Sequence, residues 1–331
     1  PDGYPIPVGG KLIQKQHAAT LRTLASGGAD AFYKGEIAEK ISGDVQANGG
    51  LLEVSDFAQY TPFLHRHGIL GEYRGYEVMG LPGPTSGPTV METLNILSTF
   101  ELNGTDHGDP AVLHLIVEAI KLAASDRFTW MGDPEITGAP IGALTVPAYG
   151  AERAKSIDRA KAGPAYAGNP WPYEGREKPD DFPGPAGAAA DDGTTHISVV
   201  DKDRNAVALT QTNLAYSGVV NPGVGVMMNN GIGWSCPIPG TVNTIAPHAR
   251  ALNNMTPLIL LKDGQLSGVL GSSGGRRIWT SVIHTLIHHI DQGMSLQEAV
   301  QAPRIHVEDG DVMVDGRFGY DTINGLESRG H

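Results

Sequence analysis

A glycine followed by two threonines, Gly193-Thr194-Thr195, is the pattern in this chain best suited to covalent chemistry. Glycine tolerates strained backbone dihedrals and leaves its carbonyl open to a neighbouring hydroxyl. The Thr194 hydroxyl can attack the Gly193 carbonyl to form an ester, and water then opens the ester and leaves Thr194 as a new N-terminus. An N-terminal threonine needs no separate base, because its own α-amine, with a pKa of about 8, accepts the hydroxyl proton. The alternative is an ordinary loop that leads into a threonine-rich strand.

A second stretch, Gly271 to Gly275, has the sequence Gly-Ser-Ser-Gly-Gly and runs through Arg276 into an expected helix. Backbone amides at the N-terminus of a helix stabilise anions, including the oxyanion that develops on an attacked carbonyl. The stretch lacks the Gly-Lys-Ser/Thr ending of a phosphate-binding loop, so nucleotide binding is not expected. An oxyanion site and a plain strand-to-helix turn are both open interpretations at this point.

Two histidines, His284 and His288, are four residues apart and share one face of an expected helix. Such a pair can hold a metal ion, but no glutamate follows His284 as in zinc proteases, and no third ligand is evident. We therefore expect ordinary helix histidines here and predict no metal and no cofactor. A metal-dependent hydrolase built on this pair is the alternative.

Composition excludes several classes of protein. The chain has 331 residues, a formal net charge of −12, 40% hydrophobic residues and 18% charged residues. It is long enough to bury a large core, and its charged residues are too few for a disordered polyelectrolyte. The negative charge disfavours a nucleic-acid partner, and no apolar stretch approaches the length of a membrane span. Cys236 is the only cysteine, which excludes a disulfide framework and a cysteine-based zinc site.

The elements that must position these residues differ along the chain. In the first half, apolar spacing predicts helices, and the run from Tyr73 to Met79 predicts a strand. Residues 132–193 are rich in Pro, Gly and Ala without a period, so we expect a linker or surface excursion there. The expected helices cover residues 12–24, 32–45, 89–100 and 111–131.

From Thr194 onward the chain becomes rich in β-forming residues. The turns 203–205 and 263–264 each separate two such runs and predict hairpins. Ser295 and Glu298 form a capping box that opens a helix. Another helix is expected over residues 277–292, and strands over residues 195–201, 206–212, 225–228, 258–262, 267–270 and 307–314. This order predicts an α+β fold with antiparallel sheets, not an alternating doubly wound fold.

Five stretches, taken in order, resemble the γ-glutamyltransferase family. Residues 72–76 and 82–87 are similar to the core of that family's large subunit, and residues 193–201 to the start of its small subunit. Residues 271–275 resemble its glycine-rich oxyanion segment, and residues 299–304, which end Ala-Pro-Arg, match another family stretch. Several ordered motifs are far more specific than any one of them.

The resemblance implies the N-terminal nucleophile hydrolase fold, an α+β fold in which two antiparallel sheets form a four-layer αββα sandwich with helices outside. It also implies a precursor that cuts itself between Gly193 and Thr194. Residues 1–193 would be the large-subunit portion, without its N-terminal part, and residues 194–331 the small-subunit portion. The two would stay together as a heterodimer that forms one intertwined domain.

The resemblance also implies catalytic roles. Thr194 would be the nucleophile, and Thr212 would support it by hydrogen bonding. Backbone amides around Gly274 and Gly275 would hold the oxyanion, and water or an amine acceptor would release the acyl group. The expected partners are therefore a small-molecule amide and the two fragments themselves, with no nucleic acid and no membrane span.

The substrate-binding positions depart from the family pattern. In typical members, Asn-Asn is followed by polar residues that bind the γ-glutamyl ammonium group, but here Gly231 and Trp234 occupy those places. An ammonium group would lose its charge partner there, which costs affinity in a buried site. The family's paired serines appear as two asparagines, which can still donate hydrogen bonds. The substrate residues carried over from the resemblance are Asn213, Asn230, Trp234, Asn253 and Asn254.

We therefore expect a self-processing threonine amidohydrolase or acyltransferase that cleaves γ-glutamyl amides such as glutathione. An amidohydrolase that acts on a non-glutamyl or acyl amide is the first alternative, and an unprocessed, non-catalytic relative is the second. The family resemblance favours a periplasmic or secreted protein, and a cytoplasmic one is also compatible with the sequence.

Overall fold

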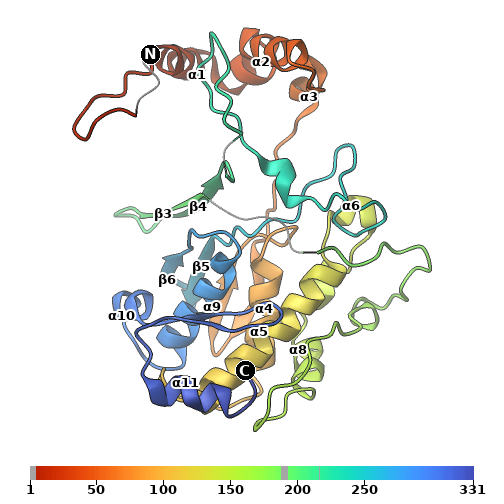
Figure 1. Cartoon of the computed structure of the whole chain (residues 1–331), viewed down its shortest axis with the longest axis vertical. Helices are drawn as coiled ribbons and strands as arrows, with labels where there is room; N and C mark the ends of the chain where they lie inside the picture. The colour runs from red at the N-terminus through yellow and green to blue at the C-terminus, as the bar shows by residue number, and fades with distance from the viewer. Residues whose placement is uncertain (1–4, 188–192, 216) are drawn as a thin grey trace. The chain divides into compact units, whose positions relative to one another are not determined.

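The computed structural model describes residues 5–187, 193–215 and 217–331 and divides into two units. The smaller unit comprises Pro1–Leu64 and Ala215–Asn230, and the larger comprises His65–Leu214 and Gly231–His331. Each unit therefore contains chain from both sides of the predicted cleavage site. Figure 1 shows the helices and strands of both units. In the described part of the chain, no helix is both long and apolar enough to cross a bilayer.

In its described residues, the smaller unit consists of three helices and a returning loop. The helices are α1 (Lys15–Tyr33), α2 (Glu36–Ala47) and α3 (Val54–Gln59). The predicted strand at residues 225–228 is wrong: this stretch is irregular, with only a single bridge between Val220 and Met227. Its backbone is hydrogen-bonded to the preceding loop, since the Met228 amide donates to the Val219 carbonyl at 2.9 Å. The neighbouring Val224 carbonyl accepts from the Thr20 hydroxyl of α1 at 2.7 Å.

A four-stranded antiparallel sheet lies at the centre of the larger unit. Its strand order is β1-β2-β5-β6, with β1 (Ile69–Tyr73), β2 (Tyr76–Met79), β5 (Leu258–Lys262) and β6 (Gln265–Leu270). The predicted single strand from Tyr73 to Met79 is wrong, because Arg74 and Gly75 both adopt positive φ and turn the chain into a hairpin. Strand β2 pairs with β5, so the sheet joins residues from both sides of Gly193.

Helices α4 (Gly87–Leu97), α5 (Pro110–Trp130) and α9 (Arg277–Ile290) form the main core with this sheet, and α11 (Tyr320–Glu327) packs on α5 (Figure 1). Every residue of α4 is buried, as expected for a helix that is surrounded by protein on all sides. The expected helices over 89–100, 111–131 and 277–292 are confirmed, with ends shifted by a few residues.

Residues 132–193 are not a linker, which corrects the expectation from composition. They contain α6 (Pro134–Thr137), α7 (Ile141–Leu144), α8 (Pro147–Ala154) and a 3₁₀ turn at Trp171–Glu174. Tyr149, Trp171 and Phe182 are buried in a second apolar cluster. These elements are too short for a hydrophobic period, and prolines near their starts resemble loop signals. Residues 188–192 lie outside the described residues.

The predicted hairpin after the cleavage site is confirmed as β3 (Thr194–Val200) and β4 (Ala206–Thr212). The cross-strand pairs Ile197–Leu209 and Val199–Val207 share one face of this ribbon, and all four side chains are exposed. The opposite face carries Thr194 and Thr212.

The C-terminal part of the larger unit combines short elements. The capping box is confirmed, since the Ser295 hydroxyl accepts from the Glu298 amide at the start of α10 (Leu296–Gln301). The predicted strand over residues 307–314 is wrong, and two short paired strands, β7 (Ile305–His306) and β8 (Met313–Val314), flank a loop instead. Charged Glu308, Asp309 and Asp311 interrupt the apolar run between them.

A buried charge network ties α8 to α4 and α5. Asp126 accepts hydrogen bonds from Arg153 Nε at 2.8 Å and from the Tyr149 hydroxyl at 2.7 Å. Glu92 is fully buried, and burial together with the neighbouring Asp126 raises the pKa of its carboxyl well above the usual value. Arg153 is thus the cation that compensates the buried acids of this cluster.

We expect Arg153→Leu to lower the free energy of unfolding by about 3–5 kcal/mol, because it leaves Asp126 buried without its charge partner. Denaturant titration of the purified protein measures this change. Lys155→Ala is the matched control: it removes an exposed ion pair to Glu152 at the end of α8 and should change stability little. Equal stability of the two variants would contradict a compensating role for Arg153.

Candidate active site

The predicted nucleophile, Thr194, begins β3 directly opposite Thr212 at the end of β4. The Thr212 hydroxyl donates a hydrogen bond to the carbonyl oxygen of Gly193, the carbonyl at the predicted cleavage site. It also accepts a hydrogen bond from the Leu214 amide at 2.9 Å. Because that amide occupies a lone pair of the hydroxyl, its single hydrogen is directed to the Gly193 carbonyl. The structure thus brings Gly193, Thr194 and Thr212 together.

Only glycine fits at position 193 without strain. Its φ of +75° lies in the region that disfavours side chains, and an added Cβ would lie 2.6 Å from the Leu214 carbonyl oxygen. Leu214 itself has a φ of +55° and a buried side chain, and this backbone turn directs its amide back to Thr212. The junction is therefore closely packed, and a side chain at position 193 would meet both an unfavourable φ and the Leu214 carbonyl.

The glycine-rich segment 271–275 connects β6 to α9. Gly274 and Gly275 have positive φ, and their carbonyls accept from the Arg277 and Ile278 amides at the first turn of α9. At its other end, a Cβ on Gly271 would lie 2.7 Å from Nε2 of His196, which shows how closely the segment approaches β3. Since His196 and Thr194 share one face of β3, the segment lies beside the nucleophile strand.

His196 is a residue that the sequence reasoning did not place in the site. Its Nδ1 lies 2.8 Å from the Thr210 hydroxyl, and its Nε2 lies 3.0 Å from the Ser198 hydroxyl. Burial lowers the pKa of the imidazole below its usual value, so the neutral ring is favoured. The signal in the sequence was the position of His196, two residues after Thr194 and thus on the same face of a predicted strand.

A pocket of about 340 Å³ opens beside this strand. Its lining includes His196, Gly271, Ser272, Ser273 and Arg304. Arg304 belongs to the Ala-Pro-Arg stretch that the sequence analysis singled out.

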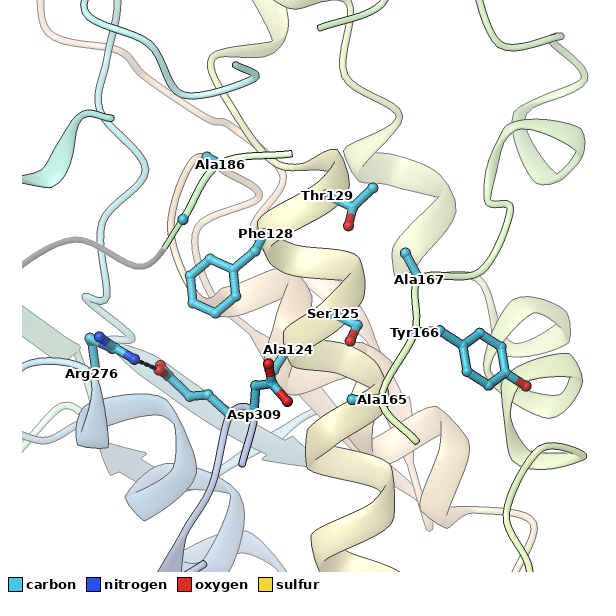
Figure 2. A pocket seen from close by; sticks show the side chains of 12 residues that line it. Ala124, Ser125, Phe128, Thr129, Ala165, Tyr166, Ala167, Ala186, Arg276 and Asp309 are labelled. Carbon is cyan, nitrogen blue, oxygen red and sulfur yellow. Dashed lines mark hydrogen bonds and ion pairs between the residues drawn. The ribbon is translucent and has the colours of Figure 1, made fainter. Parts of the chain in front are cut away.

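A larger pocket of about 410 Å³ is lined in part by Arg276, the residue that follows the glycine-rich segment (Figure 2). Ser125, Phe128 and Thr129 of α5 line one wall, and Arg276 forms an ion pair with buried Glu308. The pocket lining thus combines a charged group, Arg276, which directly follows the predicted oxyanion glycines, with the apolar ring of Phe128.

The loop that contains Asn253 and Asn254 is hydrogen-bonded to residues just before α4 and to α5. The Asn253 amide nitrogen Nδ2 donates to the Pro84 carbonyl at 2.9 Å, and its Oδ1 accepts from the Met255 amide at 3.1 Å. Buried Arg127 of α5 donates to the Asn253 carbonyl at 2.8 Å and to Asn254 Oδ1 at 3.0 Å. The pair is therefore rigidly placed, and the fold itself uses most of the polar atoms of Asn253.

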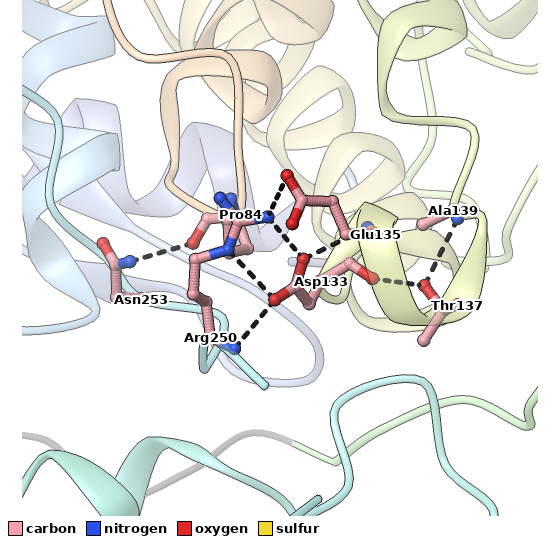
Figure 3. Close-up of polar contacts among 7 residues, drawn as sticks. All are labelled: Pro84, Asp133, Glu135, Thr137, Ala139, Arg250 and Asn253. Carbon is pink, nitrogen blue, oxygen red and sulfur yellow. Dashed lines mark hydrogen bonds and ion pairs between the residues drawn. The ribbon is translucent and has the colours of Figure 1, made fainter. Parts of the chain in front are cut away.

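Asp133 and Arg250 hold the preceding part of this loop (Figure 3). Arg250 donates to Asp133 through its backbone amide, Nε and Nη2 at 2.6–3.0 Å. These hydrogen bonds lower the pKa of the Asp133 carboxyl, although its burial acts in the opposite direction. Sequence reasoning missed this clamp because its two residues are 117 positions apart.

Trp234 ends a 3₁₀ turn, Gly231–Trp234, that is joined to the asparagine loop. Buried Asn243 donates to the Trp234 carbonyl at 2.7 Å and accepts from the Leu252 amide at 2.8 Å. The turn and the asparagine loop are thus bound to one side chain. Asn213 follows Thr212 at the end of β4, whereas Asn230 belongs to the smaller unit.

The two helix histidines are packed as the sequence suggested. His284 is fully buried, and burial lowers the pKa of its imidazole well below the usual value, with His288 as a second cause. Among the described residues, no group of three or more His, Cys, Asp or Glu side chains is arranged to hold a metal ion.

The chain is similar to known proteins over its whole length. A family model described as gamma-glutamyltranspeptidase matches residues 1–331. The glutathione hydrolase proenzyme of Escherichia coli (strain K12) is 37% identical over 347 residues, which cover 99% of this chain and 57% of that protein. The Acylase ACY 1 proenzyme of Pseudomonas sp. (strain SE83) is 35% identical over 334 residues, which cover 100% and 57%.

A solved structure is similar as well. The crystal structure of cephalosporin acylase from Bacillus halodurans superposes with a TM-score of 0.87 at 29% identity, over 100% of this chain and 57% of that chain. The chain thus spans little more than half the length of these relatives. Matched over all of its 331 residues, it belongs to the gamma-glutamyltranspeptidase family.

Proposed function

We propose that this chain carries the catalytic centre of a self-processing amidohydrolase or acyltransferase with Thr194 as its nucleophile. The observation that carries the proposal is the hydrogen bond from Thr212 to the Gly193 carbonyl, directly beside the first residue of β3. A hydroxyl fixed on that oxygen stabilises the negative charge that develops when the carbonyl is attacked. The proenzyme relatives support the same conclusion.

The self-cleavage step follows from this geometry. The Thr194 hydroxyl oxygen bonds to the Gly193 carbonyl carbon and loses its proton, while the Thr212 hydroxyl stabilises the oxyanion. The C–N bond then breaks, the Thr194 nitrogen takes a proton, and an ester joins Gly193 to the Thr194 side chain. Water hydrolyses that ester to a Gly193 carboxylate and a free N-terminal threonine.

Turnover would use the same hydroxyl. The new α-amine of Thr194 removes the hydroxyl proton, and the oxygen attacks the substrate amide to give an acyl-enzyme and a free amine. Backbone amides around Gly274 and Gly275 would hold the oxyanion. Water or an acceptor amine then takes the acyl group.

The two fragments would stay together as one heterodimer after cleavage. The central sheet supports this, because β1 and β2 precede Gly193 and β5 and β6 follow it, with β2 hydrogen-bonded to β5. Buried Arg127 from the first portion also bonds Asn253 and Asn254 from the second. Folding before cleavage would therefore bury the interface that later joins the fragments.

We further propose the four-layer αββα arrangement of N-terminal nucleophile hydrolases. Its support is the ribbon of β3 and β4, which exposes Ile197, Val199, Val207 and Leu209 on one face. A two-stranded ribbon with an apolar face is marginal on its own and needs a packed layer over that face.

The acyl donor has two candidates. Family membership favours γ-glutamyl amides such as glutathione. Trp234 and Gly231 favour an acyl group without an ammonium, because they supply no carboxylate to pair with one. The Acylase ACY 1 relative fits this second candidate.

The nucleophile can be tested by intact mass. We expect the wild-type protein to yield two fragments, one of which begins at Thr194, because hydroxyl attack splits the Gly193 carbonyl. Thr194→Ala should remain one chain, while Thr195→Ala, which changes an exposed neighbour on β3, should still be cut. An uncut wild type, or a cut Thr194→Ala protein, would refute the assignment.

The role of Thr212 can be tested by the rate of cleavage. Thr212→Val keeps the shape but removes the hydroxyl on the Gly193 oxygen, so self-cleavage should slow by about 10²-fold. Thr212→Ser retains the hydroxyl and should stay near the wild-type rate. A Thr212→Val protein that cuts as fast as wild type would show that the hydrogen bond does not stabilise the oxyanion.

Substrate choice can be tested with two anilides that differ by one group. γ-Glutamyl anilide carries the α-ammonium, and glutaryl anilide lacks it. Trp234→Asp should raise the kcat/KM ratio of γ-glutamyl to glutaryl substrate by about tenfold, since a new carboxylate attracts the ammonium. Asparagine has nearly the same shape as aspartate but carries no charge, so Trp234→Asn should not shift the ratio. Equal shifts in both variants would mean that Trp234 acts only by its size.

A further inference from the structure

We propose that His196 is a positioning residue, which fixes the glycine-rich segment 271–275 against the strand that carries Thr194. The proposal rests on the proposed function, because it gives that segment its oxyanion role. Its own evidence is a chain of hydrogen bonds and one close contact, and neither depends on the reaction.

The hydrogen bonds run in one direction from β4 through β3 to β6. The Val269 carbonyl can only accept, so the Ser198 hydroxyl, 3.2 Å away, donates to it. Ser198 must then accept from Nε2 of His196, which carries the ring proton. The other ring nitrogen, Nδ1, therefore accepts from the Thr210 hydroxyl. The geometry assigns a single tautomer to the neutral ring.

This series of hydrogen bonds ends where the glycine-rich segment begins. Val269 is the second-last residue of β6, and Gly271 follows the strand directly. A Cβ on Gly271 would meet three atoms of the imidazole ring, at 2.7 Å from Nε2 and closer to the other two. His196 thus contacts the segment from one side and, through Ser198, holds the strand that leads into it.

The other end of the segment is fixed by a helix. At its far end, Gly274 and Gly275 are bonded to the first turn of α9. Its position relative to Thr194 is therefore set by α9 at one end and by His196 at the other. Since a misplacement of about 1 Å in an active site costs about 10²-fold in rate, the imidazole controls how well the oxyanion donors are aligned.

His196 does not act as a general base in this arrangement. Both ring nitrogens are engaged, and burial lowers the pKa of the ring. A base would need a nitrogen directed at the reacting hydroxyl. Its effect is instead exerted through Ser198 and Gly271.

Graded substitution of His196 tests the role. His196→Gln places an amide nitrogen near Nε2 and can still donate to Ser198, whereas His196→Asn reaches only the Nδ1 position. We expect His196→Ala to lower kcat by about 10²-fold with little change in KM, His196→Gln to recover most of that loss, and His196→Asn to recover little. Equal losses in all three, or a loss in KM alone, would overturn the proposal.

A double substitution tests the close contact. Gly271→Ala alone should lower kcat, because its Cβ collides with the imidazole and displaces the segment. In a His196→Ala background the collision is gone, so adding Gly271→Ala should cost little more. Additive losses would show that Gly271 does not act through His196. Thermal unfolding of each variant shows whether the fold is retained.

Hydrogen exchange separates this proposal from the proposed function. Backbone amides of residues 271–275 should exchange faster in His196→Ala than in wild type, whether or not the protein has activity. The inactive Thr194→Ala protein should keep wild-type exchange there. Imidazole ¹⁵N shifts should also show His196 protonated on Nε2. Unchanged exchange in His196→Ala, or the Nδ1–H tautomer, would refute the positioning role even if Thr194 proves to be the nucleophile.

Discussion

The hydrogen bond from Thr212 to the Gly193 carbonyl is the interaction on which the rest of the site depends. It exists only because Thr194 and Thr212 face each other at the open end of a hairpin. Its direction is set by the Leu214 amide, which a positive φ turns back toward Thr212. Each of these features is local, yet together they place a polarised carbonyl beside a hydroxyl. Under the proposed mechanism, this arrangement makes a hairpin of ordinary sequence a site of self-cleavage.

The hairpin must be held by the rest of the larger unit if it is to keep its geometry. A two-stranded ribbon has little stability of its own, so its contacts with β6 and the glycine-rich segment determine the geometry. Those elements in turn belong to a sheet that is shared by both sides of the cleavage site. The same packing would therefore serve the precursor and the cut form, because the proposed cleavage would remove one covalent link and leave the hydrogen bonds between β2 and β5 in place.

Sequence reasoning predicted what local patterns encode. The hairpin, the capping box at Ser295 and the long helices follow from turn chemistry and apolar period, and the structure confirms them. It failed where contacts between residues far apart in the sequence determine the local structure. Residues 132–187 fold because Trp171 and Phe182 pack in an apolar cluster. The stretch 225–228 is irregular, and Met227 forms an isolated bridge with Val220 there. The clamp between Asp133 and Arg250 has no local signal at all.

The predicted substrate-binding residues show the same limit of sequence reasoning, here in their hydrogen bonds. The family resemblance implied that Asn253 and Asn254 bind substrate, but the fold already uses Asn253 to hold the Pro84 carbonyl and the Met255 amide. A ligand that bound the same atoms would have to replace hydrogen bonds that keep the loop in place, which offsets much of what it gains. Substrate recognition would then depend on side chains that make fewer hydrogen bonds within the fold, such as the half-buried Trp234 indole. An aromatic side chain contributes area more than charge, so a substrate site built around Trp234 would select its acyl group chiefly by shape and apolar contact.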